Sequence, residues 1–297
     1  MTEHLAPPKK DWYDKYYKLL IIPPLILLIL SFISIINFAS ENGDFINKDV
    51  SLKGGTSITI SGQFNPTEVE ESLKEKFSDV KVRSISDLTT SKSLALIIES
   101  TQKPEVIKPE IERVLGLELT AENSSVEFSG SSLGESFYNQ LLKALIISFI
   151  LMSFVIFFLF RSFIPSVAVI FAVFADIVMP LAFLNYFDIP LSAAGIAAFL
   201  MLIGYSVDTD ILLTTRVLKK RGGTVNQRIY SSFKTGVFMT ITALIAVLPA
   251  FFLVTGLPDS FRQIFLILTL GLFADLINTW LVNASIIKWY ADYKKID

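Results

Sequence analysis

The 297-residue sequence contains no cysteine and only one histidine, His4, in a polar N-terminal segment. Disulfide bonds and thiolate metal sites are therefore excluded, and we expect no cofactor and no metal centre. No Gly-x-x-x-x-Gly-Lys-Ser/Thr motif occurs, so the sequence offers no P-loop nucleotide site. The formal net charge of −2 lacks the basic excess of nucleic-acid-binding proteins, so we expect no nucleic-acid partner.

Hydrophobic residues, by contrast, are abundant: they make up 52% of the chain, and 25 residues are Phe. Six hydrophobic segments are each long enough to cross a hydrocarbon core of ~30 Å. They cover residues 19–39, 141–160, 164–187, 191–215, 236–257 and 262–287. We expect the first to be an uncleaved anchor, because no small-residue cleavage site follows it. The sequence thus predicts a polytopic α-helical membrane protein with six transmembrane helices.

Lysine and arginine concentrate at the two chain ends and in the connections after the second and fourth segments. These basic residues are Lys9, Lys10, Lys15, Lys18, Arg161, Arg216, Lys219, Lys220, Arg221, Arg228, Lys234, Lys288, Lys294 and Lys295. Short loops rich in Lys and Arg stay in the cytoplasm. We therefore expect a cell-membrane protein with cytoplasmic tails at residues 1–18 and 288–297, and with transmembrane helices 2–6 within residues 139–287.

Residues 40–138, between the first two hydrophobic segments, have the pattern of a folded domain outside the cytoplasm. Strand-like runs at 55–62, 80–85, 93–100 and 125–130 alternate with helix-like runs at 66–77 and 103–116. Pro66 suits the first position of a helix, and Gly116 suits a helix end. The order β-α-β-β-α-β predicts an α+β domain of the ferredoxin-like type. Further along, the basic segment 221–234 has the composition of a separate interfacial helix at the cytoplasmic surface.

Carboxylates inside the predicted fourth transmembrane helix are the main functional signal, because each costs several kcal/mol in lipid. Asp208 lies ~12 Å and Asp210 ~9 Å along the helix from Arg216. The two acids are ~200° apart around the helix, so they cannot share one face. Asp208 shares its face with Gly204, and small residues permit close helix packing. We therefore expect Asp208 in the bundle interior and Asp210 near the cytoplasmic boundary.

Two more acids lie at depth: Asp176 in the third transmembrane helix and Asp275 in the sixth. The nearest supporting polar residues are Asn278, Thr279, Thr240 and Lys234. Burial without a counter-charge favours the neutral acid, and a carboxyl that can change protonation inside a membrane is the basic part of a proton relay. Two alternatives remain open: the acids serve only as hydrogen-bond links between helices, or they bind Na⁺.

Two motifs resemble a known family. "LKGGTSITI", beginning at Leu52, and "GYSVDTDILLTTRVLK", beginning at Gly204, are similar to segments of the SecF branch of the SecD/SecF family, within the resistance-nodulation-division (RND) superfamily. The likeness extends over nearly the whole chain and is strongest for archaeal members. Its motif positions are Gly54, Gly55, Thr56, Gly204, Ser206 and Arg216.

This resemblance implies a non-enzymatic accessory subunit of the Sec machinery, which assists export of unfolded polypeptides with the proton gradient as energy source. It also implies a SecD-like subunit, the Sec translocon channel, unfolded secretory polypeptide and membrane lipid as partners. One alternative is half of an RND-type proton-driven transporter for lipids or small molecules, although the outside domain is small for such a pathway. A membrane-embedded aspartyl protease is a third hypothesis, but no Gly-x-Gly-Asp pattern occurs.

Overall fold

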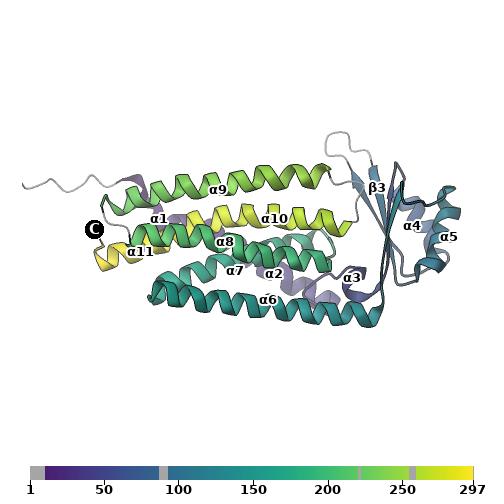
Figure 1. Cartoon of the computed structure of the whole chain (residues 1–297), viewed down its shortest axis with the longest axis horizontal. Helices are drawn as coiled ribbons and strands as arrows, with labels where there is room; N and C mark the ends of the chain where they lie inside the picture. The colour runs from purple at the N-terminus through teal and green to yellow at the C-terminus, as the bar shows by residue number, and fades with distance from the viewer. Residues whose placement is uncertain (1–10, 87–92, 220–221, 254–258, 297) are drawn as a thin grey trace, which may run out of the picture.

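The computed structural model describes residues 11–86, 93–219, 222–253 and 259–296. The expectations for the tail at 1–10 and for Lys220 and Arg221 lie outside these residues. Within them, six helices are long and apolar enough to cross a membrane, as the sequence predicts. The membrane helices form an elongated bundle, and a small mixed domain caps one end of it (Figure 1).

The bundle has a buried centre and an exposed periphery. In chain order its helices are α2 (Ile22–Asn42), α6 (Ser131–Phe160), α7 (Phe163–Tyr186), α8 (Ala193–Lys219), α9 (Val225–Leu253), and α10 (Asp259–Ile277), which continues through the π-helix η1 (Asn278–Asn283) into α11 (Ala284–Lys294). Half or more of the most apolar stretch is buried in α7, α8 and the α10–α11 rod, against about a tenth or less in α2, α6 and α9. The central three helices therefore hold the interior of the bundle, and the other three present apolar faces to lipid.

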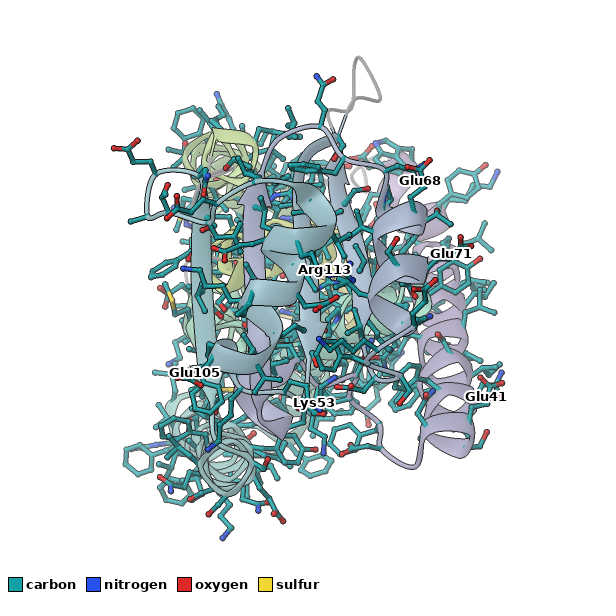
Figure 2. All side chains as sticks on the ribbon, turned by 90° about the vertical axis from the view of Figure 1, so that its right-hand side faces the viewer. Glu41, Lys53, Glu68, Glu71, Glu105 and Arg113 are labelled. Carbon is teal, nitrogen blue, oxygen red and sulfur yellow. The ribbon has the colours of Figure 1, made fainter. Side chains whose placement is uncertain are left out.

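The capping domain has the predicted ferredoxin-like order: β1 (Gly55–Ser61), α4 (Pro66–Lys74), β2 (Lys81–Ser86), β3 (Ser93–Ser100), α5 (Pro104–Leu115) and β4 (Ser124–Ser129). Its antiparallel sheet has the strand order β2-β3-β1-β4. Viewed from this end of the molecule, α4 and α5 lie in front of the sheet, on the side away from the bundle (Figure 2). Ile58 and Ile98, paired across β1 and β3, pack on this helical side. Ser57 and Glu99, the next pair, lie on the opposite side of the sheet because strand side chains alternate.

Two segments differ from the sequence-based expectation. Residues Trp12–Leu20, expected to belong to a tail, form helix α1, which Asp11 and Asp14 close with a capping box. This helix buries Tyr13 and Tyr17 at the end of the bundle opposite the sheet, and Asp14 pairs with Lys288 of α11 at 2.9 Å. The basic segment is not a separate interfacial helix. From Val225 onward it forms the first turns of α9, which continues through Gly236 into the apolar residues that follow.

The Gly-Gly-Thr motif lies where β1 begins, after the short helix α3 (Val50–Lys53). Gly54 has φ +88°, and a Cβ there would lie 2.4 Å from the Cα of Ser131, at the start of α6. Gly55 has φ +131°, and a Cβ there would lie 2.4 Å from the carbonyl oxygen of Ser100. Thr56 donates through Oγ1 to the Gln102 carbonyl at 2.5 Å. The glycines therefore let β1, β3 and α6 meet without side chains between them.

The Gly54→Ala variant is expected to lose about 3 kcal/mol of stability, because a strained backbone and an overpacked contact add together. Gly43→Ala is the matched control: Gly43 also has a positive φ of +75°, but nothing lies within 4 Å of its added Cβ. It should lose only about 1 kcal/mol. Thermal unfolding in detergent measures both variants, and equal losses would contradict the close approach of α6 to β1.

Candidate functional site

Three carboxyl groups meet in the interior of the bundle. Asp176 of α7, Asp210 of α8 and Asp275 of α10 are each 0% exposed. A buried polar group without a hydrogen-bond partner is costly, and the cost is greater for a charged one. The described residues around these acids offer hydroxyl and carboxamide donors, which come from α8, α9 and η1.

Asp176 is bound by one residue from each of two neighbouring helices. Ser206 of α8 donates through Oγ to Oδ2 at 2.5 Å, and Asn278 of η1 donates through Nδ2 to Oδ1 at 2.7 Å. The Ser206 carbonyl in turn accepts from Thr209 Oγ1 at 2.9 Å. Thr209 Oγ1 also lies 3.1 Å from Asp275 Oδ1. Ser206 and Thr209, three residues apart on α8, therefore lie between Asp176 and Asp275.

Asp275 and Asp210 are joined by a single hydroxyl group. Thr279 Oγ1 lies 3.0 Å from Asp210 Oδ1 and 3.0 Å from Asp275 Oδ1. Asn283 Nδ2 donates to the same oxygen of Asp210 at 2.7 Å, and Thr240 Oγ1 of α9 lies 3.4 Å from Asp275 Oδ2. A threonine hydroxyl has one hydrogen to donate and lone pairs to accept. Thr279 can make a separate hydrogen bond to each of the two carboxyls only when one of them is protonated and donates to Thr279.

The donors Asn278, Thr279 and Asn283 lie on the π-helical turn of the sixth membrane helix. The Ala284 N–H bonds to the Thr279 carbonyl, five residues back, instead of the residue four back. Such turns are rare and occur frequently at functional sites, because they change the direction in which side chains point. The sequence indicates a polar face here, and Asp275, Asn278, Thr279, Val282 and Asn283 are all buried. It gives no signal of the π-helix itself.

The expected facing of the two acids in α8 is wrong. Asp208 is exposed, whereas Asp210 is fully buried. The buried line of α8 follows i, i+4 spacing through the fully buried residues Ala198, Leu202, Ser206 and Asp210. Ser206 lies ~40° from Asp210 around the helix but ~160° from Asp208. Gly204, which shares the face of Asp208, has no described residue within 4 Å of an added Cβ, so its small size serves no contact among the residues that the structure describes.

The other candidate residues divide between the site and its surroundings. Thr240, Asn278 and Thr279 contact the acids directly, as described above. Lys234 lies on the exposed side of α9. Arg216 ties α8 to α9 through the Ser231 carbonyl at 3.1 Å and the Thr235 hydroxyl at 2.9 Å. Thr209 is a further site residue that the sequence does not single out, because its role depends on which face of α8 is buried.

The family model for the C-terminal region of the protein-export membrane proteins SecD and SecF matches residues 112–293, which include α6 to α11. The chain belongs to the SecD/SecF protein-export family. A protein-export membrane protein SecF of Methanothermobacter thermautotrophicus is 37% identical, covering 94% of each chain. The SecF of Pyrococcus furiosus is 36% identical over 92% of this chain and 90% of its own.

A solved structure also shares the fold. The crystal structure of SecDF, a translocon-associated membrane protein from Thermus thermophilus, matches 97% of this chain with a TM-score of 0.76 at 20% identity. This chain spans 39% of the length of that protein. The family member described here therefore has the fold of one part of a larger SecDF chain.

Gly236 of α9 lies against Trp280 of η1, with no room for a side chain between them. A Cβ on Gly236 would lie 2.3 Å from the Trp280 ring, which also packs edge-on against Phe233 at 5.2 Å between centroids. Gly236→Ala should therefore displace Trp280 and cost about 2 kcal/mol through overpacking. Gly204→Ala, with open space around it, should be neutral. Thermal unfolding and tryptophan fluorescence check both variants, and a neutral Gly236→Ala would argue against this packing of the π-turn.

Proposed function

We propose that this SecD/SecF family member is an accessory subunit of the Sec machinery. It assists the export of unfolded polypeptide across the cytoplasmic membrane and draws on the proton gradient through Asp176, Asp210 and Asp275. The observation that carries the proton coupling is the Thr279 bridge. One hydroxyl between two buried carboxyls requires a proton on one of them, and moving that proton exchanges their roles.

The arrangement supports a relay rather than a set of static links between helices. Asp176, Asp275 and Asp210 come from three different helices, so a change of charge at one acid alters the contacts between helices. Three carboxylates so close together in a medium of low dielectric repel one another strongly. Loading and release of protons can thus be coupled to small movements of α7, α8 and α10. Thr279 and Thr209 supply the hydroxyl groups between the acids.

The basic residues support an orientation with both chain ends in the cytoplasm and the ferredoxin-like domain outside. Helix α1 and the C-terminal helix α11 lie at the same end of the bundle, opposite the sheet (Figure 1). Lipid surrounds the exposed apolar faces of α2, α6 and α9. The ferredoxin-like domain is then on the side where a translocating polypeptide leaves the Sec channel.

A SecD-like subunit is the proposed partner at the exposed face of α8. Met201 and Asp208 are exposed along this face, and Gly204 leaves room for the close approach of another helix. An acid facing hydrocarbon is expensive, so a protein partner with a polar group is the expected neighbour of Asp208. The size of the SecDF protein from Thermus thermophilus, of which this fold is 39%, supports such a pairing.

The test of the relay compares two neighbouring acids of α8. Asp210→Asn should insert and fold but reduce the rate of protein export in cells to that of a strain lacking the protein, because its amide cannot carry a proton. Asp208→Asn should strongly weaken co-purification with a SecD-like chain. Complexes that do form should still export protein at a rate close to that of the wild type. Pulse-chase labelling of an exported protein measures the rates. Normal export with Asp210→Asn would reject the relay, and dependence of export on the Na⁺ gradient would replace the proton by Na⁺.

The bridging hydroxyl gives a second test. Thr279→Val keeps the shape of the side chain but removes the hydroxyl between Asp210 and Asp275, so proton uptake coupled to export should fall strongly. Thr279→Ser restores the hydroxyl and should restore most of the uptake. Fluorescence of a pH-sensitive dye inside vesicles follows proton movement. Equal uptake in the valine and serine variants would show that Thr279 only fills space.

A further inference from the structure

The chain segment that leads from α2 into the ferredoxin-like domain lies against the loop between α7 and α8. The Asp49 N–H donates to the Leu191 carbonyl at 3.0 Å, and the Leu191 N–H donates to the Asn47 carbonyl at 2.5 Å. Asn185, near the end of α7, donates through Nδ2 to the Phe45 carbonyl at 2.9 Å. The domain is therefore attached to the central helices of the bundle by its own backbone.

The Ser51 hydroxyl connects Asp49 with the N-terminus of α8, the helix that carries Asp210. Its Oδ1 accepts from the Ser51 N–H and from Ser51 Oγ, both at 2.6 Å. Ser51 Oγ in turn accepts from the N–H of Ala193, the first residue of α8, at 2.9 Å. The first N–H groups of a helix have no partner within the helix, so Ser51 acts as a cap supplied by the other domain. A change at Asp49 reaches α8 through this hydroxyl.

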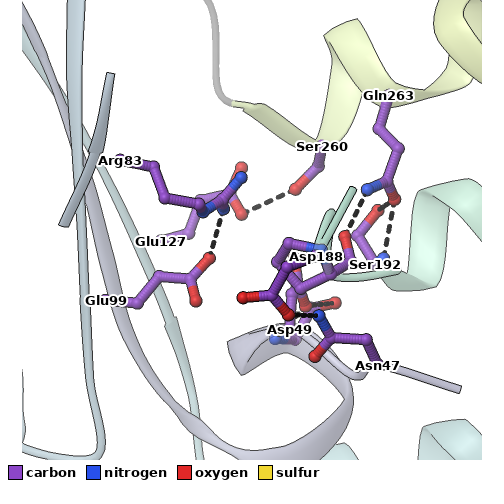
Figure 3. A network of polar contacts seen from close by, with 11 residues as sticks. Asn47, Asp49, Arg83, Glu99, Glu127, Asp188, Ser192, Ser260 and Gln263 are labelled. Carbon is purple, nitrogen blue, oxygen red and sulfur yellow. Dashed lines mark hydrogen bonds and ion pairs between the residues drawn. The ribbon is translucent and has the colours of Figure 1, made fainter. Parts of the chain in front are cut away.

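The surroundings of Asp49 are acidic. Asp49 is 8% exposed and Glu99 of β3 is 5% exposed, and Glu127 of β4 lies on the same side of the sheet (Figure 3). Burial is the main cause that raises the pKa of Asp49 to about 7. The hydrogen bonds from Ser51 oppose this rise, and the charges of Glu99 and Glu127 add to it.

The neighbouring charged groups have partners of their own. Arg83 of β2 pairs with Glu99 at 2.6 Å, and Glu127 accepts from Ser260 of α10 at 2.7 Å (Figure 3). Asp188 of the α7–α8 loop accepts from Asn47 at 2.7 Å, and Lys48 pairs with Asp44 at 2.8 Å. Further charges near the junction are Lys53 at the end of α3, Lys81 on β2, Arg262 on α10, and the ion pair of Glu70 and Lys74 on α4. The hydrogen bonds of the Asp49 carboxylate come from Ser51, a neutral residue.

We propose that Asp49 is a proton-binding latch, which holds the ferredoxin-like domain against the N-terminus of α8 when it is protonated and loosens that contact when it is ionised. An ionised Asp49 adds a negative charge beside Glu99 and Glu127, of which Arg83 offsets one, and repulsion then favours separation of the sheet from the bundle. The latch depends on the junction and not on the relay of Asp176, Asp210 and Asp275, so it stands apart from the proposed function.

The direction of the pH effect follows from the raised pKa. Asp49 has a pKa of about 7 in the docked structure, against an ordinary value of 3.8 in water. A group with a raised pKa in one state favours that state fully at low pH, and this contribution is lost as the pH rises through the higher value. Docking should therefore be strongest below pH 3.8, weaken progressively as the pH rises from there, and lose the whole contribution of Asp49 by about pH 7.

Spin-label distances in the full-length chain test the latch, and the absence of native cysteine makes labelling specific. One label goes on Glu71→Cys of α4, labelled in Figure 2, and the other on Tyr186→Cys, which is 76% exposed at the end of α7. In lipid nanodiscs the distance distribution should change as the pH rises from 3.8 to about 7, with a midpoint inside this range. With Asp49→Asn it should stay at the docked distance throughout the pH range.

Three further variants make the result specific. Asp44→Asn, on the same linker, should keep the midpoint, because the salt bridge with Lys48 helps to hold the pKa of Asp44 below its usual value. Ser51→Ala removes the Oγ hydrogen bond to Asp49, which favours the ionised form, and also removes the cap on Ala193, so the midpoint should shift away from the wild-type value. This shift also tests the latch if Asp49→Asn does not fold. Asp210→Asn should keep the wild-type midpoint. A midpoint unchanged by both Asp49→Asn and Ser51→Ala, or the absence of any change with pH in the wild-type protein, would overturn the proposal.

Discussion

The interior of the bilayer offers no water, so every acid placed there must find its hydrogen-bond partners in the protein. This constraint explains the centre of the bundle. Asp176, Asp210 and Asp275 are surrounded by the hydroxyl and amide groups of α8, α9 and η1. The Thr279 hydroxyl has one hydrogen and contacts two carboxyls, so a separate hydrogen bond to each needs a proton on one of the acids. The shared proton can lie on either of the two bridged carboxyls, and each position gives a different distribution of charge between the helices.

Close packing of the central helices follows from the same requirement, because short contacts between side chains of different helices need backbones that lie near one another. Gly195 and Gly271 allow α8 and α10 to pack closely. A Cβ at Gly195 would lie 2.3 Å from the Gln263 side chain, and one at Gly271 would lie 2.3 Å from the Leu202 side chain. The Gln263 side chain in turn holds the start of α8 through Ser192. The outer end of α8 is thus fixed by α10 and by Ser51, and its buried side carries Ser206 and Asp210 to the acids of the other helices.

Much of this fold follows from local sequence signals. Hydrophobic length predicts the six membrane helices, and the alternation and turn residues of 55–130 predict the ferredoxin-like order. The site is only partly predictable. Depth in the membrane identifies Asp176 and Asp275, but depth is nearly equal for Asp208 and Asp210. The face that becomes buried is decided by the helices packed against α8, and a single helix does not encode that choice strongly. The π-turn and the burial of Asp49 arise from contacts between residues far apart in the sequence, so no local sequence pattern predicts them.

The protonation of the central carboxyls in the resting protein is the most direct test. Isotope-edited infrared spectroscopy of the purified protein in lipid, with labelled aspartate, distinguishes protonated carboxyl from carboxylate. The Thr279 bridge requires a protonated carboxyl at neutral pH, and the corresponding absorption should be lost or displaced in Asp210→Asn and unaffected in Asp208→Asn. A spectrum with carboxylate alone at neutral pH, unchanged by Asp210→Asn, would contradict a shared proton in the bundle.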